Sequence, residues 1–269
     1  MTAAAAAGTR PEATVGVGTL LHVLWRSFFF LAATNFERMQ NVGFAYAMLP
    51  ALRRLHRGKA LDDAVQRHLA FFNSHPYMAG ALLGAAVRIE QDIAAGRRQP
   101  MEVEAFKRCM MGPMAAVGDS FFWASLRPFG AAWAVAGVLS GVIWAPLAFL
   151  LLYNLFHLTV RGYGLFAGYR SAEAIIQRIT RIELVRLADR LHIVTGVFLG
   201  AAGALFADRA MRSPVGIGDG LEPFLLATLT VIFVLCIKRK LAMPLLLYGF
   251  TAGCIALMVG LNALFPLID

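Results

Sequence analysis

The stretch that decides how this chain is organised is FFNSHP, residues 71–76. Three polar side chains, Asn73, Ser74 and His75, stand in a row inside an otherwise apolar region. Pro76 disfavours helical geometry at the residue before it and suits the first turn of a new helix. Asn commonly ends helices, and Ser commonly caps their beginnings. The stretch therefore predicts a break between two helices, the second running over residues 77–95.

The region before the break has the pattern of an amphipathic helix. Side chains suited to a buried face recur at three- and four-residue steps: Leu61, Val65, His68, Leu69 and Phe72. This spacing places them on one side of a helix over residues 60–72. Asp62 and Asp63 fall in its first turn, where the helix dipole favours negative charge.

The region after the break contains two further interruptions. Gly112–Pro113 and Gly118–Asp119–Ser120 divide the stretch 109–127 into short apolar pieces. In a membrane protein, irregular backbone survives only where protein or a water-filled cavity satisfies its polar groups. Discontinuous helices of this kind hold substrate near the midplane of transporters. The spacing predicts broken or re-entrant helices here.

Composition and hydropathy indicate the class of protein. The 269 residues are 59% hydrophobic and 15% charged, whereas soluble domains average about 45–50% and 25%. Residues 128–160 and 241–268 contain no Asp, Glu, Lys or Arg, and each exceeds the roughly 20 residues that cross a bilayer. The first is too long for one simple span, so we expect a kink at Pro146 or a division into two pieces. We predict an all-α membrane protein with several transmembrane helices, broken or re-entrant helical hairpins and amphipathic helices.

The distribution of charge supports a multi-pass membrane protein. The net charge is +9, and the basic residues cluster beside apolar stretches, at 53–59, 97–98, 107–108 and 238–240. The positive-inside rule places such clusters in cytoplasmic loops. Nucleic-acid binding is therefore disfavoured. The triplet 238–240, between apolar runs at 223–237 and 241–268, is expected to form a cytoplasmic turn.

The chain is expected to form one membrane domain after a short tail. Residues 1–14 are small and polar and lack the pattern of a signal peptide, so we predict a flexible tail. Residues 15–34 are apolar but interrupted by Arg26; they either lie at the membrane interface or cross it at a tilt. Residues 35–127 carry the motifs, and residues 128–269 are expected to be mainly membrane-spanning. Three cysteines without metal spacing, Cys109, Cys236 and Cys254, are expected to be buried and reduced.

Taken together, the motifs resemble a known family. NFERMQNVGFAYAMLPALRRL (35–55), RHLAFFNSHPYMAGALLGAAVRIEQ (67–91) and MGPMAAVGDSFFWASLRP (111–128) occur in that order. They resemble the IID component of the mannose/fructose/sorbose class of bacterial sugar phosphotransferase systems (PTS), whose patterns are NyERMqglGfaya, HleFFNTHPy and MGPlAGiGDslfw. LLYNLFHLTVRGYGLFAGYR (151–170) is similar to a later family segment. The likeness covers residues 15–266.

The resemblance implies a function and a set of partners. A IID subunit pairs with a IIC subunit to form the membrane permease, as a trimer of heterodimers with an elevator-like moving core in the lipid bilayer. The transported sugar, expected to be a hexose, is phosphorylated by the phosphohistidine of IIB, which receives its phosphate from IIA and ultimately from phosphoenolpyruvate. IID itself is not phosphorylated. Mannose, glucose, fructose, sorbose and amino sugars all remain open.

Several positions depart from the family pattern, and they leave a second hypothesis open. The acidic cluster that follows the break in the family is reduced in this chain. Ser74 stands where the family has Thr, Ala116 where it commonly has Gly, and Asn41–Val42 where it commonly has a Gly–Leu type pair. A regulatory or interaction protein that keeps the fold without transport is the alternative. A stand-alone enzyme is disfavoured, because no nucleophile with its base, phosphate-binding loop or metal ligand set is evident. We therefore expect no catalytic residue, cofactor or metal.

The candidate substrate-binding residues are polar groups within or beside the breaks: Glu37, Gln40, Asn73, Ser74, His75 and Asp119. Amide, hydroxyl and imidazole groups both donate and accept hydrogen bonds, as sugar hydroxyls do. An ionisable residue at membrane depth is a functional hypothesis by default. Five of the six have a structural alternative. The three FFNSHP residues and Asp119 would cap helix ends, and Glu37 would pair with Arg38 or Arg26.

Overall fold

The computed structural model describes residues 14–172, 190–201, 203 and short pieces between 228 and 253. The chain divides into two compact units, Met1–Ala202 and Gly203–Asp269, and every element below belongs to the first. The described residues are helical, and among them only isolated β-bridges occur. The predicted tail lies outside the described residues up to residue 13, and the predicted span over 241–268 lies largely outside them.

The first helices are short. They are α1 (Val17–Ser27), α2 (Asn41–Leu55) and α3 (Lys59–His68). The 11 residues of α1 extend about 16 Å at 1.5 Å per residue, about half of a bilayer's hydrocarbon core. Residues 15–34 therefore do not form one continuous helix. The α3 helix confirms the predicted amphipathic helix but ends before residue 72.

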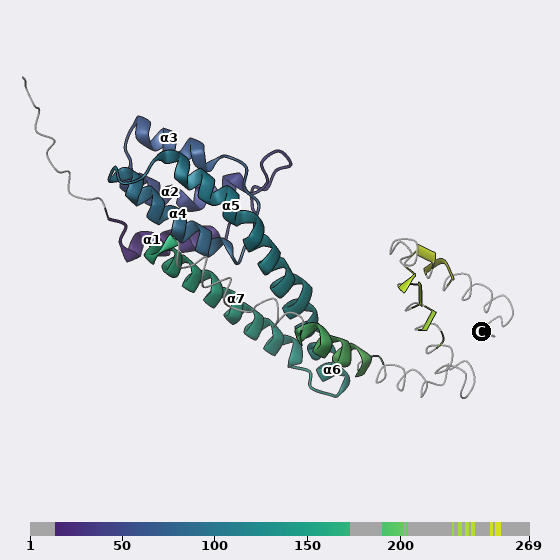
Figure 1. Ribbon diagram of the computed structural model, residues 1–269. Helices are drawn as coiled ribbons and strands as arrows, with labels where there is room; N and C mark the ends of the chain where they lie inside the picture. The colour runs from purple at the N-terminus through teal and green to yellow at the C-terminus, as the bar shows by residue number, and fades with distance from the viewer. Residues whose placement is uncertain are drawn as a thin grey trace, which may run out of the picture. The chain divides into compact units, whose positions relative to one another are not determined.

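The centre of the unit is α4 (Ala79–Ala94), which packs along α7 (Ala145–Arg170) (Figure 1). Thirteen of its 16 residues are buried. Its glycines permit this contact. A Cβ atom at Gly80 would lie 2.2 Å from the carbonyl oxygen of Arg161, and one at Gly84 would lie 2.0 Å from that of Leu165. Small residues allow the two backbones to approach closely, as they do between membrane helices.

The predicted interruptions at 112–113 and 118–120 are not breaks. The chain runs without a gap through α5 (Pro100–Gly118), the π-helix η1 (Asp119–Leu126) and α6 (Arg127–Leu139) (Figure 1). Pro113 lies inside α5, where it removes one main-chain donor. In a π-helix each main-chain hydrogen bond joins residues five positions apart. The helix can therefore continue through an irregular stretch of sequence. The Ser125 hydroxyl donates to the carbonyl of Ser120 at 2.7 Å and supports this segment.

The long apolar stretch 128–160 divides into two pieces, one of the two predicted outcomes. A turn at residues 140–144 joins α6 to α7, and Gly141 takes φ +91° there. Pro146 lies in the first turn of α7 rather than at a kink. Within the described ranges, no helix combines the length and apolarity that crossing a membrane requires.

The break at FFNSHP is confirmed. α3 ends at His68 and α4 begins at Ala79. The carbonyl of His75 accepts hydrogen bonds from the main-chain N–H groups of Met78 and Ala79, both at 3.0 Å. The predicted capping role of Ser74 is wrong, because Met78 is the N-cap and no side chain caps this helix. The predicted burial of Cys109 is also wrong, since it lies on an exposed face of α5.

Candidate functional site

The FFNSHP break is bound to the loop that precedes α2. The Gln40 N–H donates to the Phe72 carbonyl at 2.8 Å, and the Phe72 N–H donates to the Arg38 carbonyl at 3.3 Å. The side chain of Gln40 then accepts a hydrogen bond from the Ser74 N–H at 2.9 Å. Gln40 and Ser74 are both buried. Two candidate residues that lie 34 positions apart therefore share one site.

His75 is enclosed by aromatic rings. Its ring stacks on Phe122, with centroids 5.3 Å apart and planes at 13°. Trp123 and Tyr77 approach edge-on, at 4.8 and 4.9 Å. A Cβ atom at Gly118 would lie 2.3 Å from the Cγ atom of His75, so the end of α5 lies directly against the ring. The segment predicted as a broken helix instead supplies one side of the site as a continuous π-helix.

The polar atoms of the break are not all paired. The Nδ1 atom of His75 accepts a hydrogen bond from the Tyr77 N–H at 3.3 Å, so the proton of the neutral ring is assigned to Nε2. Burial, and next the charge of Arg161, lower the pKa of His75 to about 4, which keeps the ring neutral at pH 7. His75 Nε2 and Ser74 Oγ are buried and have no hydrogen-bond partner in the described part of the chain. Leaving such a group unpaired costs about 1–3 kcal/mol.

Arg161 holds the break from the other side. It lies on α7, is 4% exposed, and donates to the carbonyls of Pro76 at 2.9 Å and Ser27 at 3.3 Å. Its guanidinium lies 4.9 Å from the Phe28 ring centre. Ser27 is the last residue of α1, so the negative end of that helix dipole compensates the charge. Sequence analysis missed Arg161, although it is the first charge after the long apolar stretch.

α7 adds a second aromatic contact. The ring of His157, one turn before Arg161, stacks on Tyr77 with centroids 4.3 Å apart. Tyr77 therefore lies between two histidines, His75 and His157. The His157 Nε2 atom lies 3.0 Å from the side-chain oxygen of Asn154. Within the described residues, the site is therefore formed by the loop that precedes α2, the FFNSHP break, η1 and α7.

A separate polar cluster centres on Glu90 of α4, which is fully buried. Arg67 donates to both of its carboxylate oxygens, at 2.6 and 2.7 Å, while His56 and His68 bind it at 2.9 and 3.0 Å. Burial alone would raise the pKa of Glu90, but these hydrogen bonds together hold it well below its usual range. Burial lowers the pKa of His68 to about 4. These contacts fix α2 and α3 on α4. Glu90 belongs to the reduced acidic cluster that follows the FFNSHP break, and its partners give it a structural role.

Lys107 of α5 joins this cluster to the break. It is 2% exposed, lies 4.8 Å from the Phe44 ring centre, and donates to the Arg67 and His68 carbonyls at 3.4 Å. Those carbonyls form the C-terminal end of α3, where a cation is favoured. Burial lowers the pKa of Lys107 to about 8.

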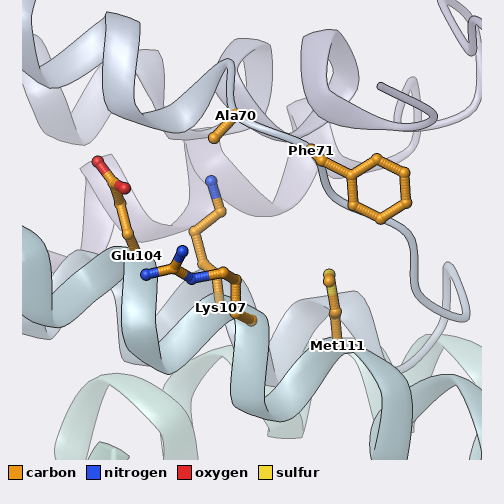
Figure 2. Close-up of a pocket in the computed structure, with 6 residues that line it drawn as sticks. Ala70, Phe71, Glu104, Lys107 and Met111 are labelled. Atoms are coloured by element: carbon orange, nitrogen blue, oxygen red, sulfur yellow. The ribbon is translucent and has the colours of Figure 1, made fainter. Parts of the chain in front are cut away.

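A surface pocket of about 240 Å³ lies beside Lys107. Figure 2 shows the Lys107 side chain reaching toward Ala70, with Phe71 and Met111 on the other side. The remaining lining residues are Glu104 and Arg108. None of the six candidate residues lines this pocket, so we do not assign the sugar to it.

Three candidate residues are not brought into the site. The Glu37 side chain is 82% exposed and lies 3.6 Å from Arg38, which was its structural alternative. Asn73 points to the surface beside the buried Ser74 and His75. Asp119 is exposed in the first turn of η1. The N-cap of η1 is Gly118 and no side-chain hydrogen bond caps this helix, so the capping alternative for Asp119 is wrong as well.

Comparison with known proteins gives consistent matches. A family model described as the PTS system mannose/fructose/sorbose family IID component matches residues 15–262. The mannose-specific EIID component of Escherichia coli K12 is 37% identical over 182 residues, which are 66% of this chain and 64% of that protein. The fructose permease IID component of Bacillus subtilis is 35% identical over 178 residues, 65% of each chain. The chain thus spans just under two thirds of the length of these relatives.

Two solved structures resemble the fold over most of the chain. A chain of the cryo-EM structure of the mannose transporter ManYZ in complex with microcin E492 aligns with TM-score 0.58 and 30% identity, covering 91% of this chain and 97% of that one. A structure described as a membrane protein aligns with TM-score 0.70 and 29% identity over the same fractions.

Proposed function

Because the chain belongs to the mannose/fructose/sorbose family of PTS IID components, we propose that it is a membrane subunit of a phosphoenolpyruvate-dependent sugar permease. With a IIC subunit it forms the path along which a hexose crosses the inner membrane. Phospho-IIB, recharged by IIA, then phosphorylates the sugar. The proposed assembly is a trimer of IIC–IID heterodimers, in which this chain carries no phosphoryl group itself.

One observation carries the proposal. Ser74 Oγ and His75 Nε2 belong to neighbouring residues, are both buried, and have no partner within the described residues. A hydroxyl and a neutral imidazole N–H together match the donors and acceptors of a sugar hydroxyl pair. Phe122 and Trp123 lie against the same histidine. Aromatic faces supply the apolar contact that a sugar ring also needs.

The proposed roles follow from position. Ser74 and His75 bind sugar hydroxyls, and Gln40 fixes the backbone of Ser74 in place. Arg161 holds the carbonyl of Pro76 and thereby the orientation of the break. Glu37, Asn73 and Asp119 reach the sugar only if the IIC subunit closes over their exposed side chains, so they are the weaker members of the candidate set.

The test is phosphoenolpyruvate-dependent phosphorylation of hexoses by membranes that contain this chain and its IIC partner, with soluble IIA and IIB added. His75→Phe keeps a ring for Phe122 to stack on but removes the N–H donor. Ser74→Ala removes the second free polar atom. Ser140→Ala, at an exposed position after α6, is the matched control.

We expect His75→Phe and Ser74→Ala to raise the apparent KM for sugar at least tenfold, while Ser140→Ala stays at the parental value. Parental kinetics in both site variants would remove the site assignment and leave the transport proposal standing. A parent that phosphorylates no hexose, although it binds IIC, would overturn the transport proposal in favour of the regulatory alternative.

A further inference from the structure

The loop before α2 is a small closed structure. Asn35 and Met39 exchange two main-chain hydrogen bonds, each 3.0 Å long. The Asn35 side chain accepts from the Arg38 N–H at 2.7 Å and donates to the side-chain oxygen of Asn41 at 2.8 Å. The loop therefore has a fixed shape. Its three central residues, Phe36, Glu37 and Arg38, form what we call the loop tip.

The closure of the loop requires an unfavourable backbone conformation. Met39 takes φ +57° and is the one non-glycine residue with positive φ in the described part of the chain. This left-handed region is disfavoured for residues with a Cβ atom. Such conformations persist only where the surrounding structure imposes them, and they concentrate at binding and switch regions.

The side chains of the loop tip are largely exposed, and the ion pair between Glu37 and Arg38 lies within the loop tip itself. Phe36 is 107% exposed, the highest value among the exposed large apolar residues of the described chain. The side chains of Glu37 and Arg38 are 82% and 53% exposed. An aromatic side chain presented on a rigid loop is typical of residues that bind in a partner's pocket, because little conformational freedom is lost on binding.

The neighbouring charges favour a protein over lipid as the occupant. Hydrocarbon would accept Phe36 but not the adjacent Glu37 and Arg38. A fluid lipid surface also gains nothing from a loop of fixed shape, whereas a shaped protein pocket does. Charges beside an aromatic anchor are typical of the rim of a protein interface, where they select the partner.

We propose that the loop tip is a docking element that inserts Phe36 into an apolar pocket of the partner membrane subunit, with Glu37 and Arg38 meeting opposite charges at the rim. This inference rests on the proposed function, which supplies the IIC subunit as the partner. Docking would also position the sugar site. The Arg38 carbonyl accepts from the Phe72 N–H, so the loop tip and the break are joined through the backbone.

The test is the apparent affinity of detergent-purified chain for affinity-tagged IIC. Phe36→Ala removes the ring, Phe36→Tyr keeps it, and Glu37→Arg with Arg38→Glu reverses both charges. Trp144→Ala is the matched control, since Trp144 is a 62% exposed aromatic immediately before α7. The thermal midpoint of each variant checks its folding, and none should shift, because the altered side chains are exposed.

We expect Phe36→Ala and the charge reversal each to weaken IIC binding at least tenfold, with Phe36→Tyr and Trp144→Ala close to the parent. A parent that fails to bind IIC would overturn both the docking proposal and the proposed function. Equal IIC affinities of the parent and Phe36→Ala would overturn the docking proposal and leave the proposed function standing.

Two further readouts identify a different occupant. If Phe36→Ala leaves IIC affinity unchanged and the fluorescence of a Phe36→Trp variant in proteoliposomes is quenched by brominated lipids, the loop tip contacts lipid. If Phe36→Ala leaves IIC affinity unchanged but dissociates a self-associated form of this chain, the occupant is a second copy. Either result overturns the proposed IIC docking.

Discussion

The guanidinium of Arg161 donates a hydrogen bond to the carbonyl of Pro76, 85 residues earlier in the chain, at 2.9 Å. Within the described residues no ion pair joins this buried arginine to a carboxylate. Its partners are carbonyls of the FFNSHP break and of the end of α1. One side chain of α7 therefore positions the segment that carries Ser74 and His75.

Replacing Arg161 should disturb the site as well as the fold. Arg161→Met leaves the Pro76 carbonyl without its donor, at about 1–3 kcal/mol, whereas the Ser27 carbonyl still accepts a hydrogen bond from the Phe30 N–H. We expect a lower thermal midpoint and a lower kcat for sugar phosphorylation, with partial recovery of both in Arg161→Lys. Arg170→Met, at the exposed end of the same helix, is the control. A normal midpoint and normal kcat in Arg161→Met would show that the hydrogen bond to Pro76 does not position the break.

The Glu90 cluster predicts that stability falls in acid. The pKa of His68 is lowered to about 4 in the folded chain from 6.5, so the unfolded state binds the extra proton as pH drops from 6.5 to about 4. The folded state is then disfavoured by about 1.4 kcal/mol per pH unit at most. The pKa of Glu90 is also lowered; its contribution is present above its ordinary pKa of 4.5 and is lost as pH falls below that value.

Thermal midpoints measured from pH 8 to pH 4 test this prediction. We expect a plateau above pH 6.5 and a steady decline below it. His68→Gln keeps a side-chain donor for Glu90 and removes the titration of residue 68. Because the pKa of His75 is also lowered to about 4, stability of this variant should still decline below pH 6.5, but less steeply than that of the parent. An identical pH profile in the parent and in His68→Gln would contradict the assignment to His68.

Two glycine substitutions should have opposite effects. A Cβ atom at Gly84 would lie 2.0 Å from the Leu165 carbonyl oxygen, whereas nothing lies within 4 Å of one at Gly112. Gly84→Ala must push α4 from α7, at about 1–3 kcal/mol or more. Gly112→Ala lies inside α5 and should be neutral or stabilising by about 0.5–1 kcal/mol. The stability of the two variants is compared by the midpoints of urea or thermal unfolding. An equal loss of stability in both would argue against the close α4–α7 contact.

The conformation of Met39 predicts an unusual order of tolerance. Met39→Gly should be accepted, because glycine adopts positive φ without a steric penalty. Met39→Val should be poorly tolerated, since a β-branched residue is a strong outlier in that region. Sugar phosphorylation and IIC binding should stay near the parental level in Met39→Gly and should be lower in Met39→Val. Equal behaviour of the two variants would indicate that the loop relaxes in the working assembly.

Part of the site was accessible from the sequence and part was not. The break at FFNSHP follows from local chemistry, since proline restricts the residue before it whatever the surroundings. The π-helix does not. Gly112–Pro113 and Gly118–Asp119 look like helix ends locally, yet α5, η1 and α6 continue through them because packing against His75 and α7 stabilises the helix. Tertiary contacts thus override unfavourable helix propensities of about 1 kcal/mol for a glycine and about 3 kcal/mol for a proline.

The sequence by itself determined the helical class, the break between α3 and α4 and the family, because each depends on composition, on local backbone preference or on a motif. For residues 128–160 it left a kink and a division both open. The tertiary structure alone decided that Gln40 reaches Ser74 while Glu37 does not, that Arg161 holds Pro76, and that Glu90 is fully paired. These are contacts between residues 22 to 85 positions apart. Distances of that kind depend on how helices pack, which no local pattern encodes.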